Sequence, residues 1–247
     1  MDQLLADLAD QHAELAAVLA GLDAEAWDAP SRCEGWSVSD VVLHLAQTDE
    51  MALASLRGGL QDHLEQKATA WATATSVDAG AGLLVDAERG EPADVVHGRW
   101  LETSEALRAA LSAADPHERV IWVAGQLAVR TLATTRLTES WIHTRDVRTD
   151  LPVPDRIEHI ARLAWRTLPY AFAQAGLDAP APVAFELSAP NGGTWTFGET
   201  ETAGTVVRGS AFDLCEVAGQ RASAAERGLT ADGADADDVL RLVRTFA

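Results

Sequence analysis

The chain has little positive charge. Lys67 is the only lysine among nineteen basic residues, and the formal net charge is −19. Such a field repels phosphate backbones and anionic lipid headgroups, so we expect neither nucleic acid nor a membrane as a partner. A small anionic substrate is not excluded, because a local arginine could attract it.

Cysteine and long apolar runs are also scarce. Cys33 and Cys215 are the only cysteines; they are too few and too far apart to predict a disulfide framework, which favours a reducing compartment. No stretch approaches the ~18 uninterrupted apolar residues of a membrane helix. The acidic start MDQLLADLADQ lacks the basic and apolar regions of a signal peptide. We therefore expect a soluble, cytoplasmic protein.

Helical periodicity dominates the first two thirds of the chain. Apolar residues recur at helical spacing, which predicts helices over residues 2–21, 38–56, 126–149 and 155–174. Another predicted helix begins at Pro92 and ends before Asp115-Pro116. The intervening residues 60–90 are rich in Ala, Thr, Asp and Gly, and predict a broken helix or a mobile loop.

Single residues mark some of these helix ends. Ser37 is expected to cap the second helix, with Asp40 as its capping-box partner. Pro169 should bend or interrupt the helix over 155–174, because proline lacks a backbone donor.

The pattern changes after Gly176. VAFELSAP, GTWTFGE and AGTVVRGS alternate like strands, and residues 211–221 and 235–246 predict two helices. The fold class is therefore mainly α: an up-down helix bundle over 1–176, followed by a small α/β domain over 177–247.

Three residues suggest a metal site. Glu139 and His143 stand four apart in RLTESWIHTRDV, so a helix places them on one face. His44 lies in a second helical segment, WSVSDVVLHLAQTDE. Two imidazoles and one carboxylate would leave a divalent ion an open position, as catalytic sites require; the trio suits zinc, and also iron(II) or nickel.

Other interpretations exist for each residue. A glutamate and a histidine four apart often form a surface ion pair, and a lone histidine is often part of a core. Asp49 and Asp146 could orient the imidazoles, although we expect ordinary helix-surface carboxylates. The remaining histidines with charged or loop-like neighbours are predicted to face solvent: His63, His97, His117 and His159. Cys33 is expected to pack rather than to act as a nucleophile, and Trp141 and Cys215 are expected to be buried.

Two separated segments resemble one family. CEGWSVSDVVLHLA resembles the C-x-G-W-[ST]-x-x-[DE]-[VL]-x-x-H-[LI] segment of the mycothiol-dependent maleylpyruvate isomerase family, whose bundles are DinB-like. RLTESWIHTRDV resembles its R-x-x-E-x-x-x-H-x-x-D segment, and GSAFDLCEVAGQR resembles its sterol-carrier-protein-like C-terminal domain. The resemblance covers nearly the whole chain, and is strongest to a branch marked by DRIEHIARLAWRT.

The resemblance implies a metal triad of His44, Glu139 and His143, with zinc as the favoured ion and mycothiol as a cosubstrate. It also maps an arginine near the family's site onto Arg221, where it would pair with a carboxylate of the substrate or thiol. The alternative for Arg221 is to cap the end of its own helix. The implied chemistry is isomerisation or S-transfer on a small electrophilic substrate.

Competing functions stay open. Activated water on the metal would make the protein a hydrolase. The same scaffold could also serve as a tailoring enzyme of secondary metabolism, or as a metal- or ligand-binding module without turnover. We expect a monomer or a homodimer.

Overall fold

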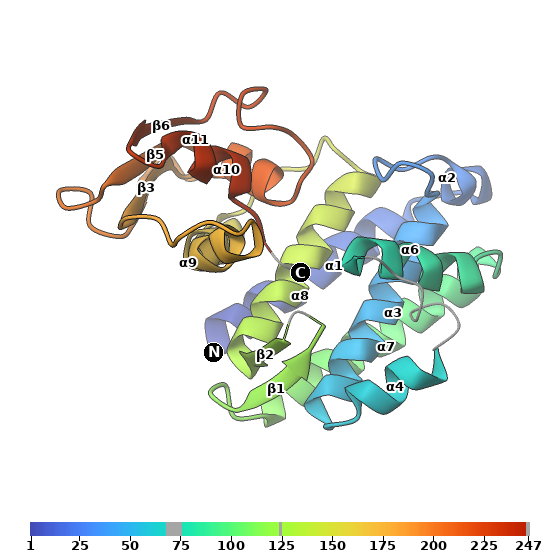
Figure 1. The fold of residues 1–247 in the computed structure, drawn as a ribbon. Coiled ribbons are helices and arrows are strands. Elements are labelled where there is room, and N and C mark those ends of the chain that lie inside the picture. The colour runs from blue at the N-terminus through green and yellow to red at the C-terminus, as the bar shows by residue number, and fades with distance from the viewer. Residues whose placement is uncertain (68–75, 124, 246–247) are drawn as a thin grey trace. The chain divides into compact units, whose positions relative to one another are not determined.

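The computed structural model describes residues 1–67, 76–123 and 125–245. The chain divides into two compact units, Met1–Leu151 and Pro152–Ala247, and each is described by itself. Figure 1 shows the helices and strands of both.

Four long helices form the frame of the first unit: α1 (Asp2–Ala20), α3 (Val38–Leu56), α7 (Ala93–Ala113) and α8 (Val129–Val147). Both α1 and α3 pack against α7 and α8, so the four enclose a shared core. Shorter helices accompany them: α2 (Ala24–Asp28), α4 (Leu60–Gln66) and α6 (Val77–Glu88).

The core follows the apolar stripes of the sequence. On α1, Leu4 and Leu8 pack into one buried cluster, whereas Leu15 and Leu19 belong to another that includes Trp100 of α7. Burial of apolar surface stabilises this packing by roughly 25 cal/mol per Å² removed from water. The predicted amphipathic helices are thus confirmed.

The start of α3 has the predicted capping box. Ser37 Oγ accepts a hydrogen bond from the Asp40 N–H at 3.2 Å, and Asp40 Oδ2 accepts one from the Ser37 N–H at 2.9 Å. These bonds satisfy two main-chain donors that the helix itself leaves unpaired. The first residue of α3 is therefore fixed, and with it the turn at which His44 stands.

A hairpin occupies part of a predicted helix. β1 (Arg119–Trp122) pairs antiparallel with β2 (Gly125–Ala128), so the helix expected over 126–149 begins only at Val129. Val120 and Trp122 are buried while Arg119 and Ile121 are exposed, an alternation that suits a strand with one covered face. Four-residue strands carry too weak a pattern to compete with the long helical signal that follows.

The region 60–90 contains α4 and α6, in keeping with a broken helix; its residues 68–75 lie outside the described part. Of the four histidines predicted to face solvent, only His117 is exposed. His97 is half-buried between the rings of Trp27 and Trp100, with centroid distances of 5.5 and 6.2 Å. That prediction was therefore wrong for His97, because Trp27 of α2 and Trp100 of the same helix α7 cover it.

The second unit is a small α/β domain. Its sheet has the strand order β4-β3-β5-β6, formed by β3 (Val183–Ser188), β4 (Thr194–Phe197), β5 (Thr205–Ser210) and β6 (Thr230–Gly233). Neighbouring strands are antiparallel except β3 and β5, which are parallel. Three helices pack against the sheet: α9 (Glu158–Gln174, preceded by the 3-10 turn Asp155–Ile157), α10 (Ala211–Ala218) and α11 (Ala236–Leu242).

The helix α9 belongs to this second unit. The expected boundary after residue 176 would have assigned α9 to the bundle, whereas α9 packs against β3, β4, α10 and α11. The helix also continues through Pro169 without the expected interruption. Pro169 is exposed, so water can satisfy the carbonyl that loses its main-chain donor.

No helix within the described residues is both long and apolar enough to cross a membrane.

Replacing Ser37 with alanine tests the capping box. We expect Ser37→Ala to lower the free energy of unfolding by about 1 kcal/mol, the usual cost of losing such a cap. Ser112→Ala, at an exposed position of α7, is the control and should leave stability nearly unchanged. Urea denaturation measures both; equal midpoints for the two variants would contradict the role of Ser37.

Candidate metal centre

The packing of α3 against α8 brings the three predicted ligands together. His44 Nε2 lies 3.2 Å from Glu139 Oε2, and His143 Nε2 lies 3.5 Å from the same oxygen. All three donor atoms fall within 4.8 Å of one another. His44 and His143 are buried, and the side chain of Glu139 is 13% exposed.

These distances fit a divalent ion. Metal–nitrogen and metal–oxygen bonds of about 2.0–2.2 Å place neighbouring ligands of a tetrahedral ion roughly 3.3 Å apart. Oxygen and imidazole donors suit zinc and other first-row divalent ions. With three protein donors, such an ion would keep a position for an exogenous ligand. The donor set thus fits a catalytic metal.

Without a bound ion, hydrogen bonds from the two imidazoles to Glu139 keep the three ligand atoms close together. Burial by itself would raise the pKa of Glu139, but hydrogen bonds from both imidazoles hold that pKa well below its usual value. Burial by itself would lower the pKa of His143, yet its hydrogen bonds to acidic neighbours and to Cys33 raise that pKa well above the usual value. Burial lowers the pKa of His44. At neutral pH, His143 is therefore the protonated member of the trio.

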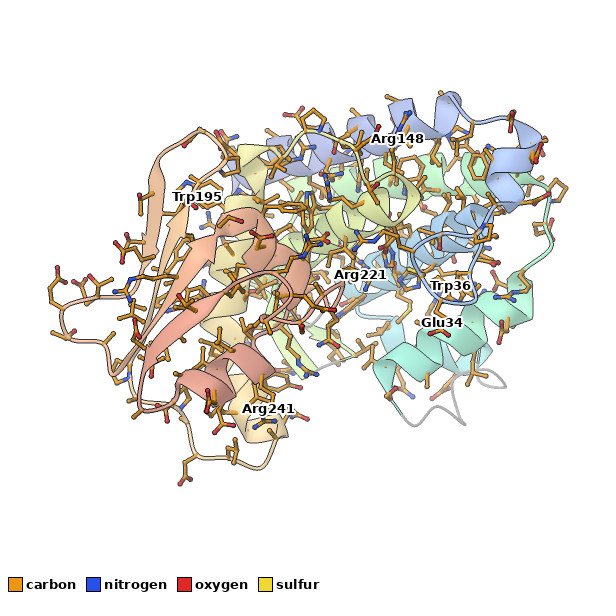
Figure 2. The ribbon with its side chains drawn as sticks, turned by 90° about the horizontal axis from the view of Figure 1, so that it is seen from above. Glu34, Trp36, Arg148, Trp195, Arg221 and Arg241 are labelled. Carbon is orange, nitrogen blue, oxygen red and sulfur yellow. The ribbon has the colours of Figure 1, made fainter. Side chains whose placement is uncertain are left out.

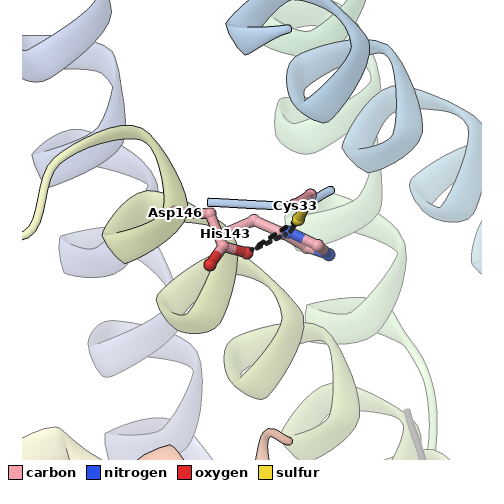
Figure 3. Close-up of side chains that lie close together, drawn as sticks. All are labelled: Cys33, His143 and Asp146. Carbon is pink, nitrogen blue, oxygen red and sulfur yellow. Dashed lines mark hydrogen bonds and ion pairs between the residues drawn. The ribbon is translucent and has the colours of Figure 1, made fainter. Parts of the chain in front are cut away.

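Asp146 supports His143 from the side away from the trio. Its Oδ2 lies 3.0 Å from His143 Nδ1 and accepts a hydrogen bond at 3.1 Å from the Cys33 thiol (Figure 3). The Asp146 side chain is fully buried, so the expectation of a surface carboxylate was wrong. A carboxylate that accepts Nδ1–H leaves Nε2 free to bind a cation, a common arrangement around metal ligands.

Asp49 is also buried, contrary to expectation. It faces Arg136 of α8, with 4.0 Å between Asp49 Oδ1 and Arg136 Nε, while Arg136 Nη2 lies 3.6 Å from Glu139 Oε2. Burial raises the pKa of Asp49 to about 7, although Arg136 opposes that shift. Arg136 therefore stands between two carboxylates, one of which belongs to the ligand trio.

Two neighbours of the site were not predicted. Trp36, in the loop before α3 that also carries Glu34 (Figure 2), packs its ring against His44 at a centroid distance of 5.1 Å. Cys33 Sγ lies 3.8 Å from His143 Nδ1, so this cysteine contacts the site. The sequence signal was present, since both residues stand in the segment that resembles the family. Trp141 and Cys215 are buried as expected.

Arg221 lies in the second unit, directly after α10 (Figure 2). Its N–H donates to Glu216 O at 2.9 Å and the Gln220 N–H to Val217 O at 2.9 Å, with Gln220 at a φ of 61°. This pattern is a Schellman motif, which fixes the backbone at the helix end. Arg221 Nη1 also donates to Gly219 O at 2.9 Å, as the helix-capping interpretation requires. Its part in the site stays a prediction.

One known family matches most of the first unit, and two relatives match nearly the whole chain. Residues 8–148 match the family described as the mycothiol maleylpyruvate isomerase N-terminal domain. Two relatives from Mycobacterium tuberculosis strains, the uncharacterized proteins MT0041 and Rv0036c, are each 32% identical over 248 residues, covering 98% of this chain and 95% of theirs.

Crystal structures of a mycothiol-dependent maleylpyruvate isomerase and of a histidine-to-alanine mutant of it are similar in fold. Both have a TM-score of 0.60, cover 94% of this chain and 92% of theirs, and are 20% and 19% identical. The similarity supports a mainly α fold with a small α/β domain.

The protonation of His143 makes a prediction for metal binding. An ion at Nε2 must displace a proton, so binding near neutral pH should release about one proton per ion. Affinity should rise about tenfold per pH unit and level off once pH exceeds the raised pKa of His143. Calorimetry in buffers of different ionisation enthalpy measures the release.

Asp146→Asn is the matched variant for that measurement. It removes the carboxylate that raises the pKa of His143, so each ion that still binds should release fewer protons. Equal proton release by both proteins would contradict the assignment of the proton to His143.

Proposed function

This chain belongs to the mycothiol maleylpyruvate isomerase family, and on that basis we propose that it is a metal-dependent enzyme that uses a low-molecular-weight thiol to convert a small electrophilic substrate. The observation that carries the proposal is the convergence of His44, Glu139 and His143 on one point. The reaction is isomerisation or S-transfer, with mycothiol as cosubstrate and zinc as the ion.

The residues of the trio have distinct tasks. His44 and His143 would each offer Nε2, and Glu139 would offer a carboxylate oxygen whose charge offsets part of that of the ion. A bound zinc ion would supply Lewis acidity, which lowers the pKa of a coordinated thiol and provides thiolate at neutral pH. Asp146 accepts a hydrogen bond from His143 Nδ1–H. The imidazole would therefore keep its orientation while the thiol binds to the ion and leaves it.

The thiolate accounts for both reactions. Its sulfur forms a bond to one alkene carbon, the π electrons move onto the adjacent carbonyl, and the former double bond can rotate. When the electrons return, the carbon–sulfur bond breaks and the thiolate leaves with the alkene isomerised. With a substrate that carries a leaving group, the bond to that group would break instead; the group would depart with the electron pair, and the sulfur would stay bonded to the carbon.

Arg221 is the proposed partner for a carboxylate of the substrate or thiol. A guanidinium binds a carboxylate through two parallel hydrogen bonds, and its fixed backbone limits the freedom that would be lost on binding.

Metal content and thiol dependence test the proposal together. Protein purified without chelator should contain about one ion per chain, and His143→Ala should lose it because one of three donors is gone. His117→Ala, at an exposed position, is the matched control and should keep the metal. Elemental analysis measures each.

Turnover of a cis-enedione acid should require both added thiol and the ion. Activity should fall to background in His143→Ala and persist in His117→Ala. Wild-type protein purified without metal would contradict the proposal. Turnover without added thiol would favour a hydrolase.

A second prediction concerns Arg221. Loss of a charge-assisted hydrogen bond costs about 1.5–3 kcal/mol, so Arg221→Ala should reduce kcat/KM for a carboxylate substrate by roughly 10- to 100-fold with metal content unchanged. Arg241→Ala removes an exposed arginine of the same unit and should have little effect. Identical kinetics for the two variants would assign Arg221 to helix capping alone.

A further inference from the structure

The loop before α3 is attached to the end of α8 at Asp146. The Arg32 N–H donates to the Asp146 main-chain carbonyl at 3.0 Å, and the Cys33 thiol donates to Asp146 Oδ2 at 3.1 Å. The main chain of Arg32 and the side chain of Cys33 thus both bind Asp146. This double contact sets the position of the loop over the site.

The loop also fixes Cys33 from within. Ser31 Oγ accepts the Cys33 N–H at 3.1 Å and donates to Trp36 O at 2.9 Å, while the Trp36 N–H donates to Cys33 O at 3.0 Å. The residues on either side of Cys33 are therefore held by hydrogen bonds. Its sulfur reaches Asp146 from a predetermined position.

One carboxylate oxygen receives both donors. Asp146 Oδ2 is bonded to the Cys33 thiol and to His143 Nδ1, and Figure 3 shows the three side chains together. An ionised carboxylate can only accept, so Nδ1 must carry the hydrogen. In a neutral imidazole that leaves the lone pair on Nε2, the atom directed at Glu139.

We propose that Cys33 is a positioning residue of the metal centre, whose thiol holds Asp146 in the orientation that keeps His143 Nε2 available to the ion. This inference rests on the proposed metal site. It assigns to Cys33 neither the attacking sulfur nor a bond to the metal.

The geometry favours this role over two others. As a nucleophile, an anionic Cys33 sulfur would stand 3.1 Å from the Asp146 oxygen, where like charges repel. Cys33, His143 and Asp146 could also hold an ion of their own. That would require Nδ1 as the ligand, the nitrogen whose N–H donates a hydrogen bond to Asp146.

Cobalt(II) affinity tests the proposal without recourse to turnover. The visible spectrum of bound cobalt(II) reports the number and type of its ligands. Competition with a chelator gives the dissociation constant of cobalt(II) from the protein. Cys33→Ala should weaken cobalt binding about tenfold, the lower range for partners that orient a metal ligand. Cys33→Ser retains a donor and should bind close to wild type. Glu34→Gln, at an exposed position of the same loop, should bind as wild type does.

Each result is decisive. Equal affinity for wild type and Cys33→Ala would overturn the positioning role while leaving the metal site intact. A thiolate-to-cobalt charge-transfer band without added thiol, absent from Cys33→Ser, would make Cys33 a ligand and also overturn it. If Cys33→Ala does not fold, Cys33→Ser carries the spectral test and its affinity must match wild type. Wild-type protein that binds no cobalt would remove the proposed function as well.

Discussion

The contact between α3 and α8 places one carboxylate between two imidazoles inside a helical bundle, and the neighbouring polar residues depend on it. A charged group away from water needs partners, since transfer of an unpaired ion into an apolar interior is very costly. Glu139 has His44, His143 and Arg136 within 3.6 Å. A divalent ion or a proton on His143 can supply the remaining positive charge. The charge of Glu139 is therefore offset by its neighbours, and a bound ion would offset it further.

Two buried carboxylates extend this charge network, Asp146 beside His143 and Asp49 beside Arg136. Asp146 accepts hydrogen bonds from His143 and Cys33. These bonds replace those that its carboxylate would make to water, and they let it hold the imidazole in place. Asp49 approaches Arg136 only to 4.0 Å, and its other oxygen has no hydrogen-bond partner in the described part of the chain. Its pKa is accordingly raised to about 7, chiefly by burial. Asp146 thus holds the imidazole of His143 in place, whereas Asp49 is paired only loosely with Arg136.

Local spacing explains which parts of the site could be predicted. Glu139 and His143 share a helical face by sequence alone, and the same spacing places Asp146 near His143. The burial of Asp146 could not be read from its helix, because its contacts with Arg32 and Cys33 come from elsewhere in the chain. Helix limits set by local capping, such as that at Ser37, were predicted to the residue. The strands of the hairpin are too short to give a clear pattern, and the packing of α9 depends on contacts with distant parts of the chain, so the sequence interpretation failed for both.

The fold likeness persists at 19–20% identity, and the physics of the bundle accounts for this. A core tolerates apolar exchange when volume and pattern are kept, and a metal trio needs three donors at fixed positions of two helices. Substrate choice instead depends on the side chains and loops around the open ligand position. Here the loop before α3 packs Trp36 on His44 and fixes Cys33 on Asp146. Under the proposed function, changes at Trp36 or Cys33 should therefore alter substrate choice or metal affinity, whereas changes at exposed positions of the loop should not.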